Sequence, residues 1–172
     1  MALYALGDQV PVIDPTAYVH PDAVVIGSVT IGAHSSIWPG AVLRGDDGAI
    51  VIGARTSIQD GTVVHTTPFD HTTVGDDCVI GHIVHLEGCV IENMAQVSSG
   101  SVVLHKAVVE TGAIVAANAV VLNGMRVPAG ALAVGAPAVI KEGKARVPDI
   151  EMAVKAYIHK GARFREQLRR ID

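Results

Sequence analysis

The chain has 172 residues and a mass of 17.8 kDa, which is the size of a single domain. Its formal net charge of −4 excludes a strongly basic nucleic-acid-binding surface, and no apolar run approaches the roughly 20 residues that span a membrane. Valine and isoleucine dominate the apolar content, with 27 Val and 15 Ile against 8 Leu and only 3% aromatic residues. Because branched aliphatic residues favour strands, this composition predicts strands around a narrow core.

Residues 1–15 contain no basic segment followed by an apolar one, so we expect no signal peptide and a cytoplasmic protein. From there, branched aliphatic residues recur every six positions, at Ile31, Ile37 and Leu43 and again at Ile52, Ile58 and Val64. Two stretches interrupt this period, residues 44–50 and residues 66–73. We expect both to leave the wall of the repeat structure, where loops commonly carry function.

The six-residue period then runs without a break, at Ile91, Val97, Val103, Val109, Val115, Val121 and Val127. The residue two places before each of these is small, except at Met125. This pattern is typical of a hexapeptide β-helix, in which three short strands make one triangular coil. The branched residue fills the prism and the small residue relieves its corner. We therefore predict an all-β parallel β-helix over residues 1–147.

A helix is predicted at the end of the chain. Residues 128–137 have the composition of a last coil and its exit, and Pro148 and Asp149 are suitable helix-start residues. Apolar residues follow on one helical face, at Ile150, Val154, Tyr157, Gly161, Phe164, Leu168 and Ile171. We expect a C-terminal α-helix over residues 148–172 that packs on the β-helix. Its other face is basic and is expected to face solvent.

Four of the eight histidines, His20, His34, His105 and His159, are predicted to be ordinary residues of turns or of the helix, while His71 lies in the second interruption, where it could approach a site. Cys78 and Cys89 occupy small inward positions, eleven residues apart, and are expected to be buried thiols without a disulfide.

The remaining histidines, His65, His82 and His85, lie near Glu87 and are the informative ones. If residues 66–73 replace a single turn, Glu87 stacks on His65 one coil later, at a strand spacing of about 4.8 Å. His82 then lies one face earlier and points away from that pair. One triangular chain cannot bring these side chains together, whereas three chains packed corner to face can. The sequence therefore predicts metal sites between the subunits of a homotrimer.

Further polar residues stand at fixed places inside the repeat, in Leu43-Arg44-Gly45-Asp46, Gln59-Asp60-Gly61, Gly81-His82 and Gly88-Cys89. With His65, these motifs resemble those of the γ-class carbonic anhydrase-like family of hexapeptide-repeat proteins. The resemblance extends from about Ile13 through the C-terminal helix. It implies a left-handed β-helix, and zinc or another divalent metal such as iron or cobalt held by three histidines from two subunits.

The resemblance assigns roles to individual residues. His65 and His82 match two of the metal ligands, and Gln59 matches the catalytic residue that orients the attacking water. Arg44, Asp46 and Asp60 match a network of charges across the subunit boundary. The chain has Glu87 where the third histidine is expected, so Glu87 or His85 is the candidate third ligand. Two imidazoles and a carboxylate still form a legitimate zinc set, but an anionic ligand predicts weaker activation of water.

The leading functional hypothesis is therefore reversible hydration of CO₂ to bicarbonate by a zinc-dependent lyase, without a nucleic-acid or membrane partner. A hexapeptide-repeat acyltransferase or CoA-thioester enzyme is the first alternative. Residues 134–138, Val-Gly-Ala-Pro-Ala, resemble the end of the coil in such relatives. The second alternative is a non-catalytic, siderophore-type ligand-binding protein.

Overall fold

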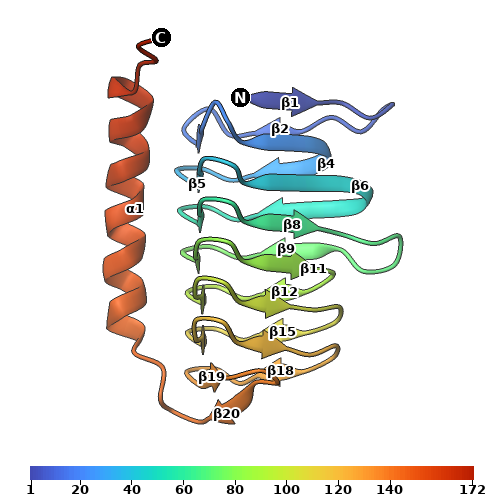
Figure 1. Cartoon of the computed structure of the whole chain (residues 1–172), viewed down its shortest axis with the longest axis vertical. Coiled ribbons are helices and arrows are strands. Elements are labelled where there is room, and N and C mark those ends of the chain that lie inside the picture. Colours follow the sequence, from blue (N-terminus) through green and yellow to red (C-terminus); the bar gives the residue numbers. More distant parts are fainter.

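The computed structural model describes residues 1–172 as a parallel β-helix with one helix along its side (Figure 1). The β-helix has three faces, named here A, B and C in the order in which the chain visits them. The corners between them are the A–B, B–C and C–A corners. Face A holds β1 (Ala2–Tyr4), the first parts of β4 (Val24–Ile31) and β6 (Val42–Ile52), β8 (Val63–His65), β11 (His85–Glu87), β14 (Val102–Val103) and β17 (Val120–Val121).

Face B continues the same sheet around the A–B corner. It holds β2 (Val12–Ile13), the last parts of β4 and β6, β9 (Thr72–Val74), β12 (Val90–Ile91), β15 (Val108–Val109) and β18 (Arg126–Val127). Face C is a separate sheet of β3 (Tyr18–Val19), β5 (Ser36–Ile37), β7 (Ser57–Ile58), β10 (Val79–Ile80), β13 (Gln96–Val97), β16 (Ile114–Val115), β19 (Leu132–Val134) and the antiparallel β20 (Val139–Lys141).

The predicted six-residue period is confirmed by burial. Each branched residue of the run from Ile91 to Val127 is fully buried, as are the upstream positions such as Ile58 and Leu86. A single cluster of 32 buried residues, mostly Val, Ile and Ala, fills the prism. The small residues between the branched ones are buried too, including both free thiols, Cys78 and Cys89, and burial raises the pKa of each thiol to about 12.

One expectation about the interruptions needs correction. Residues 44–50 do not leave the wall, because they lie within the continuous strand β6. Four residues of β6, between Gly45 and Ile50, oppose the single residue Ser28 of β4, so the insertion is absorbed as a bulge at the A–B corner. The strand can pass this closely because position 45 is glycine: a Cβ there would lie 2.6 Å from the Ser28 carbonyl oxygen. Residues 66–71 do form a loop, between β8 and β9 at the same corner.

The single helix, α1 (Val147–Gln167), runs back along face C from the last coil toward the N-terminal end (Figure 1). It begins one residue earlier than predicted and ends before Leu168 and Ile171, which are exposed. It packs against β3, β5, β7 and β10. Its buried residues Ile150 and Val154 contact Val79 of face C, and its basic residues are exposed, as predicted.

Candidate functional site

Glu87 is the centre of a polar cluster at the A–B corner of face A. It pairs in register with His65 of the preceding coil, as unit counting predicts. One carboxylate oxygen of Glu87 lies 3.0 Å from Nδ1 of His65, and the other lies 3.1 Å from Nε2 of His85. His85 and Glu87 are two residues apart in β11, so their side chains leave the strand on the same side. The predicted group of His65, His85 and Glu87 is therefore present in one chain.

The charges in this cluster are strongly coupled. Burial opposes ionisation of Glu87, but hydrogen bonds with His65 and His85 and the nearby His105 imidazole outweigh it and lower the pKa of Glu87 to about 2. Nε2 of His65 faces a second carboxylate, with Oδ1 of Asp46 at 3.1 Å. Burial also opposes ionisation of Asp46, yet its contacts with its own backbone N–H, Arg44 and His65 keep its pKa below the usual value. Both nitrogens of His65 can donate at once only if the ring is protonated.

The bulge of β6 positions Asp46 within this cluster. Arg44 and Asp46, expected to pair across a subunit boundary, contact each other within the chain. The carbonyl oxygen of Asp46 accepts a hydrogen bond from the Gln9 side chain, 3.1 Å away. His71 of the neighbouring loop accepts a hydrogen bond at Nδ1 from the Ala49 N–H, 3.2 Å away, and so fixes the loop to the bulge. The two interruptions are thus stacked at one corner, beside His65.

His105 is a member of the cluster that the sequence analysis missed. Its Nε2 lies 3.6 Å from Oε1 of Glu87, in ion-pair range, and is buried without a hydrogen-bond partner. His105 comes two residues after the core position Val103, just beyond the residue that stacks below Glu87. The sequence signal was its place one coil after Glu87. Its position in a turn, rather than in a strand, led to the prediction of an ordinary turn residue.

His82 and Asp60 lie at the opposite edge of face A, at the C–A corner. Asp60 follows β7 and His82 follows β10, one coil later. Nδ1 of His82 lies 2.9 Å from Oδ2 of Asp60, while Nε2 makes no hydrogen bond within the chain and the side chain is 48% exposed. A carboxylate on one ring nitrogen fixes the ring and its tautomer, and so prepares the other nitrogen to bind a metal. Because His82 and His65 lie at opposite edges of face A, they do not meet within one chain, and this separation agrees with the prediction.

Gln59 is placed differently from the other predicted site residues. It is only 4% exposed and lies beneath α1. Burial and the nearby Asp60 carboxylate raise the pKa of Tyr157 in α1, and a hydrogen bond with the Gln59 side chain opposes that rise. Gln59 is thus next to Asp60, at the C–A corner, but its amide faces the helix.

The donor types present fit a divalent metal ion, although they are divided between two edges. Imidazole nitrogen and carboxylate oxygen are ordinary zinc ligands and also bind iron and cobalt. Within one chain, however, no group of three or more His, Cys, Asp or Glu side chains is arranged to hold a metal ion. The His65–Glu87 edge offers two donors or three, and the His82 edge offers one. The three ligands that the resemblance assigns to one ion therefore lie on both edges of face A.

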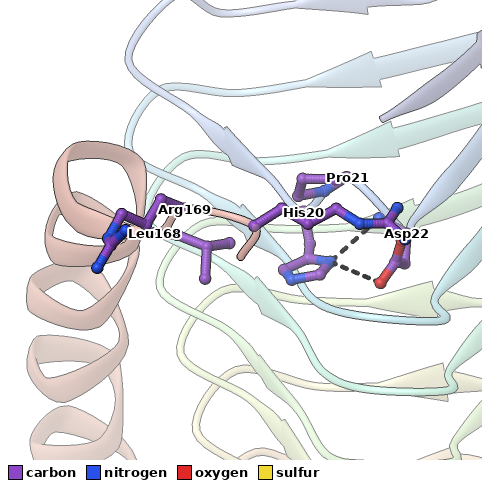
Figure 2. A pocket seen from close by; sticks show the side chains of 6 residues that line it. His20, Pro21, Asp22, Leu168 and Arg169 are labelled. Carbon is purple, nitrogen blue, oxygen red and sulfur yellow. Dashed lines mark hydrogen bonds and ion pairs between the residues drawn. The ribbon is translucent and has the colours of Figure 1, made fainter. Parts of the chain in front are cut away.

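The two cavities nearest to the C–A corner lie away from the Glu87 cluster. One of about 390 Å³ is found at the N-terminal end of the C–A corner, between His20, Pro21 and Asp22 of the first coil and residues 168–170. Figure 2 shows the His20 ring, which contacts Asp22, on one side of this cavity. Leu168 and Arg169 lie on the other side. A groove of about 260 Å³ nearer to His82 is lined by Asp60 together with Tyr157, Lys160 and Arg163. No predicted metal ligand lines either one.

Comparison with known proteins places this architecture in a class. The model of the bacterial transferase hexapeptide family, described as six repeats, matches residues 11–45. A solved structure of a hexapeptide transferase family protein from Anaplasma phagocytophilum is 36% identical, with a TM-score of 0.90, and the match covers 97% of this chain and 98% of that one. The fold and the repeat define a left-handed parallel β-helix. The chain belongs to the hexapeptide-repeat family.

Two further relatives are informative. A Bacillus cereus structure described as a "putative acetyltransferase" is 30% identical, with a TM-score of 0.94 and coverage of 97% of this chain and 98% of that one. The carnitine operon protein CaiE of Escherichia coli O157:H7 is 45% identical over 104 residues, or 60% of this chain. That match spans about half, 53%, of the length of CaiE. The helix of the present chain is not of the length and apolarity needed to cross a membrane.

Proposed function

We propose that this protein is a γ-class carbonic anhydrase-like homotrimer that holds a divalent metal ion, zinc or alternatively iron or cobalt, at each subunit interface. His65 and Glu87 of one subunit and His82 of the next would bind the ion, with His85 as the alternative to Glu87. The observation that carries this proposal is the presence of two complementary half-sites on opposite edges of face A. One is the His65–Glu87 pair and the other is His82 held by Asp60.

The outer surface of face A supports contact between subunits. The residues that point outward from its strands are largely apolar, at Val24, Val42, Val63, Val102 and Val120. An apolar surface of this kind on a small protein is typical of a binding surface. The two edges also offer one pair of opposite charges, since Arg44, which contacts Asp46, is about half exposed at one edge and Asp60, which contacts His82, is about half exposed at the other. Contact between these edges in successive subunits would bury the valines and bring His82 to His65.

When bound, the metal ion supplies Lewis-acid activation of water, and so the hydroxide that attacks CO₂ to give bicarbonate. The chain's own groups would position the ligands and move the released proton. Glu87, with a pKa of about 2, is ionised at neutral pH and is too weak a base to take that proton, which favours its role as a ligand. His85 borders solvent, and its Nδ1, which Glu87 does not hold, would be the ring nitrogen that passes the proton to water. Gln59 would orient the attacking water, for which its side-chain amide would have to release its hydrogen bond with Tyr157.

Metal analysis and stopped-flow CO₂ hydration test the proposal. Zinc-loaded wild-type protein should hold about one ion per chain, because each interface of a closed ring has one site. The His82→Ala variant should lose the ion and about 100-fold or more of the hydration rate. His34→Ala is a matched control, since His34 is an exposed corner imidazole away from both half-sites. A CO₂ hydration rate in His82→Ala equal to that of wild type would contradict the proposal.

The likeness to the Bacillus cereus protein favours acyl transfer as a second candidate function. Residues 134–138, whose composition suggested this alternative, comprise the last residue of β19 and the turn that connects β19 to β20 at the end of the last coil. In this reaction one of the histidines that contact Glu87, His65 or His85, would remove a proton from the molecule that accepts the acyl group. Saturable binding of acetyl-CoA to the metal-free protein would favour this candidate, and no binding at millimolar acetyl-CoA would exclude it.

A further inference from the structure

The C–A corner is built from a ladder of residues with left-handed backbone conformation. In five successive coils the positive-φ position is occupied by Gly40, Gly61, Ile83, Gly100 and Asn118, with φ between 57° and 72°. Backbone hydrogen bonds link each corner to the one before it, as from the Ile83 N–H to the Asp60 carbonyl and from the Gly100 N–H to the His82 carbonyl. Glycine and asparagine are the residues that adopt this conformation readily.

Ile83 is the exception in this ladder. Seven non-glycine residues of the chain have positive φ, and Ile83, at 57°, is the β-branched one among them. A β-branched side chain strains this conformation, because its Cβ substituents crowd the backbone. The Ile83 side chain is not buried within the chain. The Ile83 side chain is 73% exposed, and its Cγ1 lies against the Gly61 corner. Strain that persists at one exposed position points to a function outside the chain.

The neighbours of Ile83 indicate where that function lies. Asp60 binds His82 through its side chain and accepts the Ile83 N–H at its backbone carbonyl, so one residue fixes both. Ile83 therefore projects from the same corner as the half-site of His82. This edge carries the Asp60 carboxylate, and the opposite edge of face A carries the Arg44 guanidinium. An ion pair between these two half-exposed side chains would favour contact between the two edges of different copies, beside the apolar valines of face A.

We infer that Ile83 is an interface anchor: its side chain packs into the apolar outer surface of face A of a second copy of this chain and forms the apolar wall of the shared site. The inference rests on the proposed trimer but not on its metal or its reaction. The strained isoleucine is retained at position 83 because glycine or asparagine there would not supply an apolar side chain to the shared site. The occupant of the surface around Ile83 is thus a second copy, seated with its valines against this corner.

Sedimentation velocity over a dilution series tests the inference with Ile83→Asn and Ile83→Gly. Both variants relieve the strain, so the thermal midpoint of the dissociated chain should not fall. Both remove the anchor, so the dissociation constant of the assembly should rise about 10-fold or more, the range expected for a buried aliphatic side chain at an interface. Met94→Gly is the control, because Met94 has φ 58° at the B–C corner, away from face A.

The outcomes separate the inference from the proposed function. Assembly of Ile83→Asn that is as tight as wild type, while Met94→Gly is also unchanged, overturns the anchor alone. A wild-type protein that stays monomeric at all concentrations overturns the anchor together with the trimer. A wild-type trimer that binds no metal, but is weakened by Ile83→Asn, overturns the metal site and supports the anchor. Circular dichroism of each variant confirms that the β-helix is intact in every case.

Discussion

At the scale of single residues, the polar cluster depends on the ionised state of Glu87. The hydrogen bonds with the imidazoles exist because the carboxylate is charged, and they lower the pKa of Glu87 to about 2. The ordinary pKa of a glutamate is about 4.3, so the folded state binds fewer protons than the unfolded chain between these values. The stability contributed by Glu87 is therefore complete above about pH 4.3 and is lost as the pH falls toward 2.

This titration gives a prediction for Glu87→Gln in metal-free protein. At pH 7 the variant should be less stable than wild type by up to about 3 kcal/mol, and the difference should shrink toward zero as the pH falls to about 2. Urea unfolding at a series of pH values measures it. Glu166→Gln, on the exposed side of α1, is the control and should show no such pH dependence. A difference between Glu87→Gln and wild type that stays constant with pH would contradict the account.

Residue-level prediction from the sequence succeeded where it followed the repeat. The stacking of Glu87 on His65 and the separation of His82 both follow from counting six-residue units. The contact of His105 with Glu87 and the Asp60–His82 hydrogen bond did not follow, because they depend on side-chain direction at corners. The Arg44–Asp46 contact within one chain was also missed, since the bulge of β6 that permits it has no sequence period.

At the scale of elements, the aromatic residues explain how α1 docks. Four of the six aromatic side chains lie where the helix meets face C, and Trp38 makes edge-to-face contacts with Tyr157 and Phe164 at centroid distances of 5.6 and 5.1 Å. The narrow prism has no space for rings, so they gather outside it. Gly161 is buried at the same junction, where a Cβ would lie 3.4 Å from Cβ of Ser36 and 3.6 Å from Cβ of Tyr18.

Those distances are ordinary van der Waals contacts, which leads to a prediction for Gly161. Alanine has a higher helix propensity than glycine, so Gly161→Ala should stabilise the protein by up to about 1 kcal/mol. Gly161→Leu should instead displace α1, because the sheet leaves no room for a longer side chain. Thermal unfolding followed by Trp38 fluorescence distinguishes the two. If Gly161→Ala lowers the midpoint, the helix packs more tightly on face C than the structure indicates.

At the scale of the whole molecule, the sequence predicted the architecture more completely than the site. The period of six, the Val- and Ile-rich composition and the apolar face of the helix were enough to define a β-helix with a helix on one side. The predicted path of residues 44–50 was wrong because the sequence does not distinguish a bulged strand from a loop. The site is harder to predict because the two half-sites lie on opposite edges of face A, and in the proposed trimer they would meet through corner contacts between chains, which leave no period in the sequence.

The central claim, a metal site shared between subunits, is tested most directly by complementation. The His65→Ala and His82→Ala chains are co-expressed with different tags, and trimers that contain both are isolated by two affinity steps. Each mixed trimer has one interface that joins an intact His65 to an intact His82, so it should bind one zinc ion, about a third of the wild-type content. Each variant alone should bind none. Mixed trimers as empty of zinc as the separate variants would contradict the claim.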